Sequence, residues 1–175
     1  MQKSPIDLRH MPRNIVIIGA GIVGTSTADA LSRHDDVHVT VLDRDYADPR
    51  GSTAYAPGFV GLYNETPVLT DLARTSAAIY DTIGPAFRRS GGIELATNDT
   101  GAADVERRVH EAQSQGLHAD KVSPHAIPAE IAEILDSPLL TAASSFSDDG
   151  STDVRILCSQ LRDRATSHGT VADSV

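Results

Sequence analysis

The chain has 175 residues and a net charge of −9, from 15 basic and 24 acidic side chains. This acidity, without a basic stripe, argues against nucleic acid as a partner. Hydrophobic residues make up 40% of the chain and charged residues 22%, which excludes an intrinsically disordered protein. The single cysteine, Cys158, can neither form an internal disulfide nor build a zinc site.

Residues 1–12 are polar and predict a flexible leader. They lack the apolar region of a secretory signal. The longest run of apolar residues and glycine, Ile15 to Gly24, is far shorter than the roughly 20 residues of a membrane span. Seven histidines are scattered without metal-ligand spacing. We therefore expect a cytoplasmic protein that contacts no membrane and holds no metal.

A strand, a glycine loop, a helix and a second strand follow in turn. Residues 14–18 form a short β-branched run, which predicts a parallel strand buried on both faces. The loop Gly19-Ala20-Gly21-Ile22-Val23-Gly24 comes next, and an alanine-rich helix is predicted over 25–33. The second strand, 37–42, ends at Asp43, about 20 residues past the loop. This order predicts an α/β fold with a Rossmann-type βαβ unit and a parallel sheet.

Each part of this motif has a physical task in binding a dinucleotide. Gly19 permits a tight turn, Gly21 lets a pyrophosphate approach the backbone, and Gly24 lets helix and strand pack closely. The N–H groups at the helix start face the phosphates. Asp43 can accept hydrogen bonds from both ribose hydroxyls and disfavours a 2′-phosphate. The expected cofactor-binding residues of the motif are Gly19, Gly21, Ile22, Val23, Gly24 and Asp43.

A loop rich in glycine and proline, from Asp45 to Asn64, shows no helical period. A loop of that length inside a compact domain is usually functional. Something like a third nucleotide-domain strand appears only after Gly169. An insertion between the second and third strands, with Gly51-Ser52-Thr53 early in it, favours a flavin protein over a nicotinamide domain.

The rest of the chain alternates between predicted helices and strands. Asp148 and Asp149 are interpreted as turn residues before a capped helix rather than as a metal or acid site. A helix is predicted after a Thr66 cap, with an apolar face of Val68, Leu69, Leu72, Ile79, Tyr80 and Ile83. A strand over 91–97 precedes a helix over 104–115 with Val105, Val109 and Ala112 on one apolar stripe. The remaining predicted elements are a helical stretch over 123–135, a strand over 139–146, a helix capped by Thr152 or Asp153 that ends at Gly169, and the start of a strand over 170–175.

Four segments together resemble the N-terminal part of FAD-dependent amine oxidoreductases: 14–24, 39–43, 51–58 and 91–96. The dimethylglycine and sarcosine oxidases and dehydrogenases, in the D-amino-acid-oxidase-like superfamily, are the relatives that they resemble. The resemblance runs from about Arg13 to the C-terminus. It implies a Rossmann-type FAD half-site and part of an inserted α+β substrate domain. The chain would then divide into a leader (1–12), an FAD-binding unit with its flavin loop and long helix (13–90), a partial substrate domain (91–147), and a return helix with the start of a third strand (148–175).

The resemblance implies oxidation of an N-methyl amine by hydride transfer to flavin, after which water or a folate captures the iminium product. It places Ser52 and Thr53 near the pyrophosphate or the flavin edge, and we add Arg44 and Gly51 as expected cofactor contacts. The relatives commonly bond a histidine of the Gly-Ser-Thr-x-His-Ala-Pro-Gly stretch to the flavin. Tyr55 stands at that position here and lacks an imidazole, so we predict non-covalent FAD, with Tyr55 as a cofactor contact that packs against the flavin ring or hydrogen-bonds nearby. The sequence identifies no catalytic residue.

Two other functions remain open. One is a non-catalytic FAD- or ADP-binding fragment or subunit that needs a partner chain, and the other is an NAD-binding dehydrogenase module. In the family that the chain resembles, a later strand flanks the segment 14–18 on its other side. An apolar strand without that neighbour exposes unpaired backbone groups. We therefore expect a complementary chain to complete the fold, and this chain alone to be poorly soluble or to bind FAD weakly.

Overall fold

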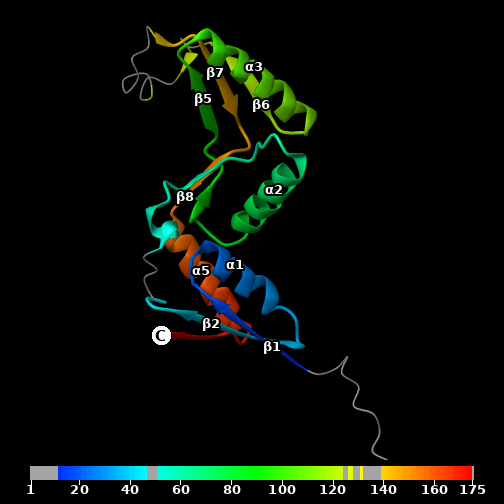
Figure 1. Cartoon of the computed structure of the whole chain (residues 1–175), viewed down its shortest axis with the longest axis vertical. Helices are drawn as coiled ribbons and strands as arrows, with labels where there is room; N and C mark the ends of the chain where they lie inside the picture. The colour runs from blue at the N-terminus through cyan, green and yellow to red at the C-terminus, as the bar shows by residue number, and fades with distance from the viewer. Residues whose placement is uncertain (1–11, 47–50, 124–125, 128–130, 132–138, 175) are drawn as a thin grey trace, which may run out of the picture. The chain divides into compact units, whose positions relative to one another are not determined.

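The computed structural model describes residues 12–46, 51–123, 126–127, 131 and 139–174, shown in colour in Figure 1. The chain forms two compact units, one of Met1–Pro57 with Asp153–Val175 and one of Gly58–Thr152. This division differs from the predicted boundaries after residues 90 and 147, because the segment 58–90 belongs to the second unit. The predicted helical stretch over 123–135 lies mostly outside the described residues.

The first unit has the predicted βαβ order followed by a later helix and strand. Its elements are β1 (Arg13–Ile18), α1 (Ile22–Leu31), β2 (Val37–Asp43), the 3-10 helix η2 (Ser52–Tyr55), α5 (Val154–Ser167) and β9 (Val171–Ser174). The strands form one parallel sheet in the order β1-β2-β9. Ile15 lies opposite Val39, and Thr40 lies opposite Val171. The α/β fold class with a parallel sheet is thereby confirmed.

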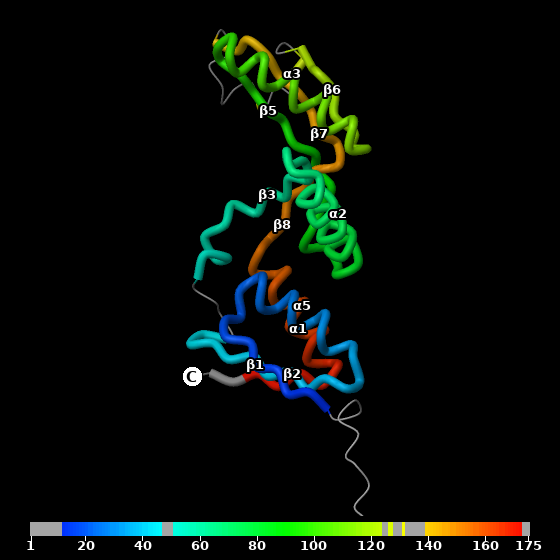
Figure 2. Tube along the Cα trace, turned by 45° about the vertical axis from the view of Figure 1, so that its right-hand side comes forward, coloured from blue at the N-terminus to red at the C-terminus, as the bar shows by residue number. Residues whose placement is uncertain are grey.

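Helices α1 and α5 lie side by side on one face of this sheet (Figure 1 and Figure 2). Asp29 of α1 is buried and links the two helices through an ion pair with Arg164 of α5, at 3.1 Å between Oδ1 and Nε. The Asp153 carboxylate caps α5 by accepting hydrogen bonds from two amides of its first turn. The buried core of the unit consists of Ala20, Ala28, Val37, Val39, Val41 and Ala165.

The prediction that the first strand is buried on both faces is wrong. Ile15 and Ile17 pack against the core, whereas Val16 is 58% exposed and Ile18 is 88% exposed. Successive side chains of a strand point to opposite faces of its sheet, and the helices cover only one face. The described sheet therefore presents an apolar outer surface that includes Val171 of β9.

The second unit holds two small antiparallel sheets. The first has the order β3-β8-β4, and its strands are β3 (Phe59–Val60), β8 (Gly150–Thr152) and β4 (Phe87–Arg88). The second has the order β5-β7-β6, and its strands are β5 (Gly92–Ala96), β7 (Ala142–Phe146) and β6 (Ala119–Val122). Helix α3 (Asp99–Ser114) packs on the second sheet, and helix α2 (Pro67–Asp81) lies near β4. This is an α+β arrangement.

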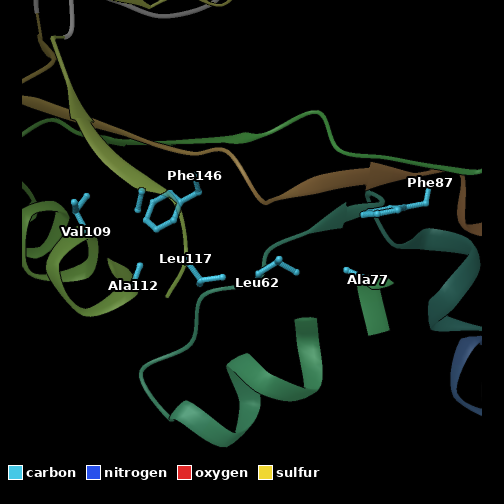
Figure 3. Close-up of a cluster of buried hydrophobic side chains, with 8 residues drawn as sticks. Leu62, Ala77, Phe87, Val109, Ala112, Leu117 and Phe146 are labelled. Carbon is cyan, nitrogen blue, oxygen red and sulfur yellow. The ribbon is translucent and has the colours of Figure 1, made fainter. Parts of the chain in front are cut away.

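The core of the second unit joins α3 to the loop before α2. Val109 and Ala112 of α3 face Phe146 of β7, and Leu117 and Leu62 continue the row, as Figure 3 shows. Tyr63 stacks on Phe146 with ring centroids 6.1 Å apart. The predicted apolar stripe of this helix is thus confirmed as its buried face.

Three local predictions need correction. The loop over 45–64 contains η2 and β3, although no regular structure was expected there. Helix α3 begins five residues earlier than predicted, because the Asn98 side chain caps it by accepting the Gly101 N–H at 2.9 Å. Helix α2 begins with Pro67 as expected, but the Thr66 side chain makes no capping hydrogen bond.

Helix α2 also differs from its pattern in which face it buries. Its buried side chains are Thr70 and Ala77, and the Thr70 hydroxyl bonds the backbone of Asn64. The apolar side chains that defined the predicted face are largely exposed: Val68, Leu69, Leu72 and Ile79.

None of the helices in the described ranges combines the length and apolarity needed to cross a membrane. Within the same ranges, no three His, Cys, Asp or Glu side chains gather closely enough to hold a metal ion.

Candidate cofactor site

The glycine loop joins β1 to α1 through a backbone conformation that favours glycine. Gly19 has a φ of +107°, and its N–H donates to the Leu42 carbonyl at 2.8 Å. This bond holds the end of β1 against β2, so that the loop turns directly into the helix. The turn that the sequence predicts at Gly19 is observed.

Gly24 permits the close contact between helix and loop. A Cβ atom at this position would lie 1.9 Å from the Gly19 carbonyl oxygen and 3.3 Å from the Ile17 side chain. No side chain fits there without displacing the backbone. The helix start can therefore approach the sheet only because residue 24 is glycine, which is the role that the motif predicts.

Asp43 at the end of β2 is fixed by two backbone amides. Its Oδ2 accepts the Ala20 N–H at 2.6 Å, and its Oδ1 accepts the Asp45 N–H at 2.9 Å. These hydrogen bonds, and the nearby charge of Arg44, hold the pKa of Asp43 below its ordinary value. The carboxylate is ionised at neutral pH and keeps lone pairs on both oxygens that can accept further hydrogen bonds.

The 3-10 helix η2 brings the Gly-Ser-Thr segment to the glycine loop. The Thr53 Oγ1 accepts the Ile22 N–H at 3.0 Å, and a Cβ on Gly21 would lie 2.9 Å from that same oxygen. Gly21 therefore admits the Thr53 hydroxyl to the helix start. The neighbouring Tyr55 is 81% exposed.

The start of α1 suits an anionic group. The helix has no acidic side chain in its first turn, and its N-cap Gly21 offers no side-chain acceptor. Among the described residues, the amides of Val23 and Gly24 have no hydrogen-bond partner. Free amides and the partial positive charge of a helix N-terminus bind phosphate groups. The residues present thus fit the pyrophosphate of a dinucleotide, with Asp43 placed beside them for a ribose.

The structure brings most of the predicted cofactor residues together, and others lie at the margin. Gly19, Gly21, Ile22, Gly24, Asp43 and Thr53 meet around the helix start. The Val23 amide lies in the same first turn of α1, whereas the Val23 side chain is exposed, as are Arg44, Gly51, Ser52 and Tyr55. Sequence reasoning missed the Ala20 amide as the partner of Asp43, because a backbone donor has no residue-type signal.

Comparisons with known proteins agree with this geometry. The family model described as FAD dependent oxidoreductase, DAO, matches residues 14–172. A curated relative from Bos taurus, FAD-dependent oxidoreductase domain-containing protein 1, is 26% identical over 94% of this chain. This chain spans 38% of the length of that relative.

Solved structures share the fold. L-proline dehydrogenase from P. horikoshii superposes with a TM-score of 0.80 at 22% identity, over 93% of this chain and 44% of its own. Glycine oxidase from Geobacillus kaustophilus superposes with a TM-score of 0.75 at 21% identity, over 94% of this chain and 46% of its own. The chain spans less than half the length of each. The glycine loop, the buttressed Asp43 and the family match over most of the sequence establish that the chain belongs to the DAO family of FAD-dependent oxidoreductases.

Proposed function

We propose that this chain is the FAD-binding part of an oxidoreductase that acts on N-methyl amines of the dimethylglycine or sarcosine kind. The open start of α1, with Thr53 and Asp43 fixed beside it, carries the proposal. The family membership supports the choice of cofactor. L-proline dehydrogenase and glycine oxidase, which share the fold, carry names of enzymes that act on a secondary and a primary amine, and this supports an amine as the substrate class.

The chain's own residues would hold and orient the cofactor. The free amides of Val23 and Gly24 would donate to the pyrophosphate, and the ionised Asp43 would accept hydrogen bonds from the ribose. Bound FAD would accept the hydride from the carbon next to the amine nitrogen as the nitrogen lone pair forms the C=N bond, and water or a folate would capture the resulting iminium.

Visible absorbance and substrate reduction test this function. We expect FAD titrated in excess into the purified chain to show the shifted absorbance of weakly bound flavin, and sarcosine or dimethylglycine to bleach that flavin under anaerobic conditions. Retention of NAD instead of FAD would replace this proposal with a nicotinamide module. A flavin spectrum that no amine bleaches would favour the non-catalytic subunit.

We further propose that FAD is held without a covalent bond. Tyr55 occupies the position at which the resembled oxidases carry a flavin-linked histidine, and its exposed side chain has no imidazole nitrogen. Denaturation of the flavin-loaded protein in acid should release all flavin to the supernatant. Flavin that stays with the precipitated chain contradicts this.

A subunit that needs a partner chain is the second candidate, and the outer sheet surface favours it. Val16, Ile18 and Val171 expose apolar side chains on one face, and β1 is an edge strand of the sheet that the described residues form. A partner that adds a strand to β1 would pair the backbone groups of this edge strand, and it would also cover the exposed apolar face. Light scattering of the chain alone should then show association, and co-expression with the partner should restore a uniform species that holds FAD.

A further inference from the structure

A second cavity, which the flavin site does not include, lies wholly within the second unit. Its volume is about 250 Å³, below the roughly 300–1,000 Å³ that is typical of sites for drug-sized ligands. Such a volume suits a ligand of a few heavy atoms. The side chains that matter to its chemistry are Phe59, Tyr63, Glu94, Arg108 and Asp149.

Asp149 supplies a buried carboxylate with an unused oxygen. The residue is only 6% exposed, and its Oδ1 accepts the Leu62 N–H at 2.8 Å. Among the described residues its Oδ2 has no hydrogen-bond partner. That oxygen lies beside Gly92, another residue of the cavity wall, because a Cβ there would be 2.7 Å from it. The sequence predicts Asp149 as a turn residue, and only the fold shows that it lines the cavity.

The other charges of the cavity already neutralise each other. The Arg108 Nε lies 2.8 Å from an oxygen of Glu94, and its guanidinium stacks 4.8 Å above the Tyr63 ring. The carboxylate of Asp149 is therefore the unbalanced charge of the wall. Burial raises the pKa of Asp149, as does the nearby Asp148 carboxylate, and the Leu62 N–H with the guanidinium groups of Arg108 and Arg89 only partly opposes this rise. Burial disfavours the charged form of a carboxylate, and a cation placed against the carboxylate stabilises that form.

An aromatic ring stands at the entrance of the same cavity. Phe59 is 60% exposed, and its ring lies between two glycines. A Cβ on Gly61 or on Gly92 would come within 3.0 Å of the ring. Because neither glycine has a side chain, the ring can lie against this part of the wall, next to the Asp149 carboxylate. The face of an aromatic ring attracts organic cations, and quaternary ammonium groups in particular.

We propose that this cavity binds a small alkylammonium ion, whose charge pairs with Asp149 Oδ2 and whose methyl groups contact Phe59. A cation is favoured over a zwitterion because a ligand carboxylate near Arg108 would also face the Glu94 carboxylate, which lies at the Arg108 Nε. The proposal does not depend on flavin chemistry, so its test uses the chain without flavin.

A ligand series separates charge from shape. Trimethylammonium chloride is titrated into the full chain and followed by NMR chemical shifts, with sodium chloride at equal ionic strength as the reference. tert-Butanol matches the shape without the charge, and glycine betaine adds a carboxylate. We expect saturable shifts of residues around the cavity with trimethylammonium, and affinities lower by about tenfold or more for the other two ligands.

Variants assign the effect to the cavity. Asp149→Asn keeps an acceptor for the Leu62 N–H and removes the charge, so the affinity for trimethylammonium should fall by about tenfold or more. Phe59→Leu removes an exposed ring without touching the core and should weaken binding several-fold. Asp71→Asn makes the same charge change on the exposed surface of α2 and should leave the affinity unchanged.

Each outcome decides the proposal. Equal binding of tert-butanol or betaine overturns the choice of a cation. Unchanged affinity in a folded Asp149→Asn variant overturns the site. If that variant unfolds, the ligand series and Phe59→Leu decide, since neither requires the loss of Asp149. If the chain binds trimethylammonium but not flavin, the proposed function is rejected and the proposal of this cation site is not.

Discussion

Single residues around the start of α1 decide how the cofactor site is held, and Asp43 is the clearest case. Its carboxylate links β2 to the glycine loop through the Ala20 N–H, and to the following turn through the Asp45 N–H. Both donors bind the charged form better than the neutral form, which lowers the pKa of this group in the folded protein. The same residue thus serves the loop geometry and the expected ribose contact.

Because the pKa of Asp43 is lower in the folded protein than in the unfolded chain, its contribution to stability is present above the unfolded value of about 3.9. The contribution is lost as the pH falls below that value and through the folded pKa. Asp43→Asn should therefore reduce the free energy of unfolding at neutral pH and reduce its fall with acidification. Urea unfolding across the acidic range measures both; parallel curves for the variant and the wild type would contradict the assignment.

At the scale of elements, the contact between helix α1 and the loop after β1 depends on Gly24. A Cβ there would sit 1.9 Å from a backbone oxygen, and backbone cannot move aside as a flexible side chain can. Gly24→Ala should lower the free energy of unfolding by about 1–3 kcal/mol, the usual cost of overpacking. Gly51→Ala is the matched control, because a Cβ at that position meets nothing within 4 Å. Denaturant unfolding of the two variants should separate them, and equal losses would refute the packing argument.

The elements also show how far periodicity alone can be followed. The stripe of α3 was predicted and is buried, whereas the apolar face of α2 was predicted and is largely exposed. The two patterns look alike in sequence. The difference is that the apolar stripe of α3 packs against the β5-β7-β6 sheet. Helix α2 instead buries Thr70 and Ala77, which lie on a different face from its apolar residues. Which face a helix buries depends on its neighbours, and these are not a local property.

At the scale of the whole molecule, the described part of the first unit covers one face of its sheet with helices and leaves the other face exposed. Ile17 packs against the core, and its neighbour Ile18 is almost fully exposed. Ile18→Thr should therefore change the free energy of unfolding by less than about 0.5 kcal/mol while raising solubility. Ile17→Thr is the same substitution at the neighbouring position, whose side chain packs against the core. It should destabilise the protein by about 1–3 kcal/mol. Thermal unfolding and light scattering test the pair; similar destabilisation by both would mean that the outer face is also packed.

The sequence by itself determined the βαβ order, the glycine loop and the acid at the end of β2, and it narrowed the cap of α5 to Thr152 or Asp153. These depend on short-range rules: β-branched runs favour strands, glycine allows a positive φ at residue 19, and Asp153 offers a carboxylate to the nearest amides. The resemblance to flavin-dependent oxidoreductases rested on the same local segments, and the family match confirms it.

Only the tertiary structure decided which faces are covered and which distant groups meet. Thr53 reaches the Ile22 amide across 31 positions of sequence, and Asp149 reaches the Leu62 amide across 87. Neither contact has a sequence signal, because one partner is a backbone N–H that every residue except proline carries. The cavity beside Asp149 arises in the same way, since its charge, ring and glycine wall come from separate strands and loops that only the packed fold brings together.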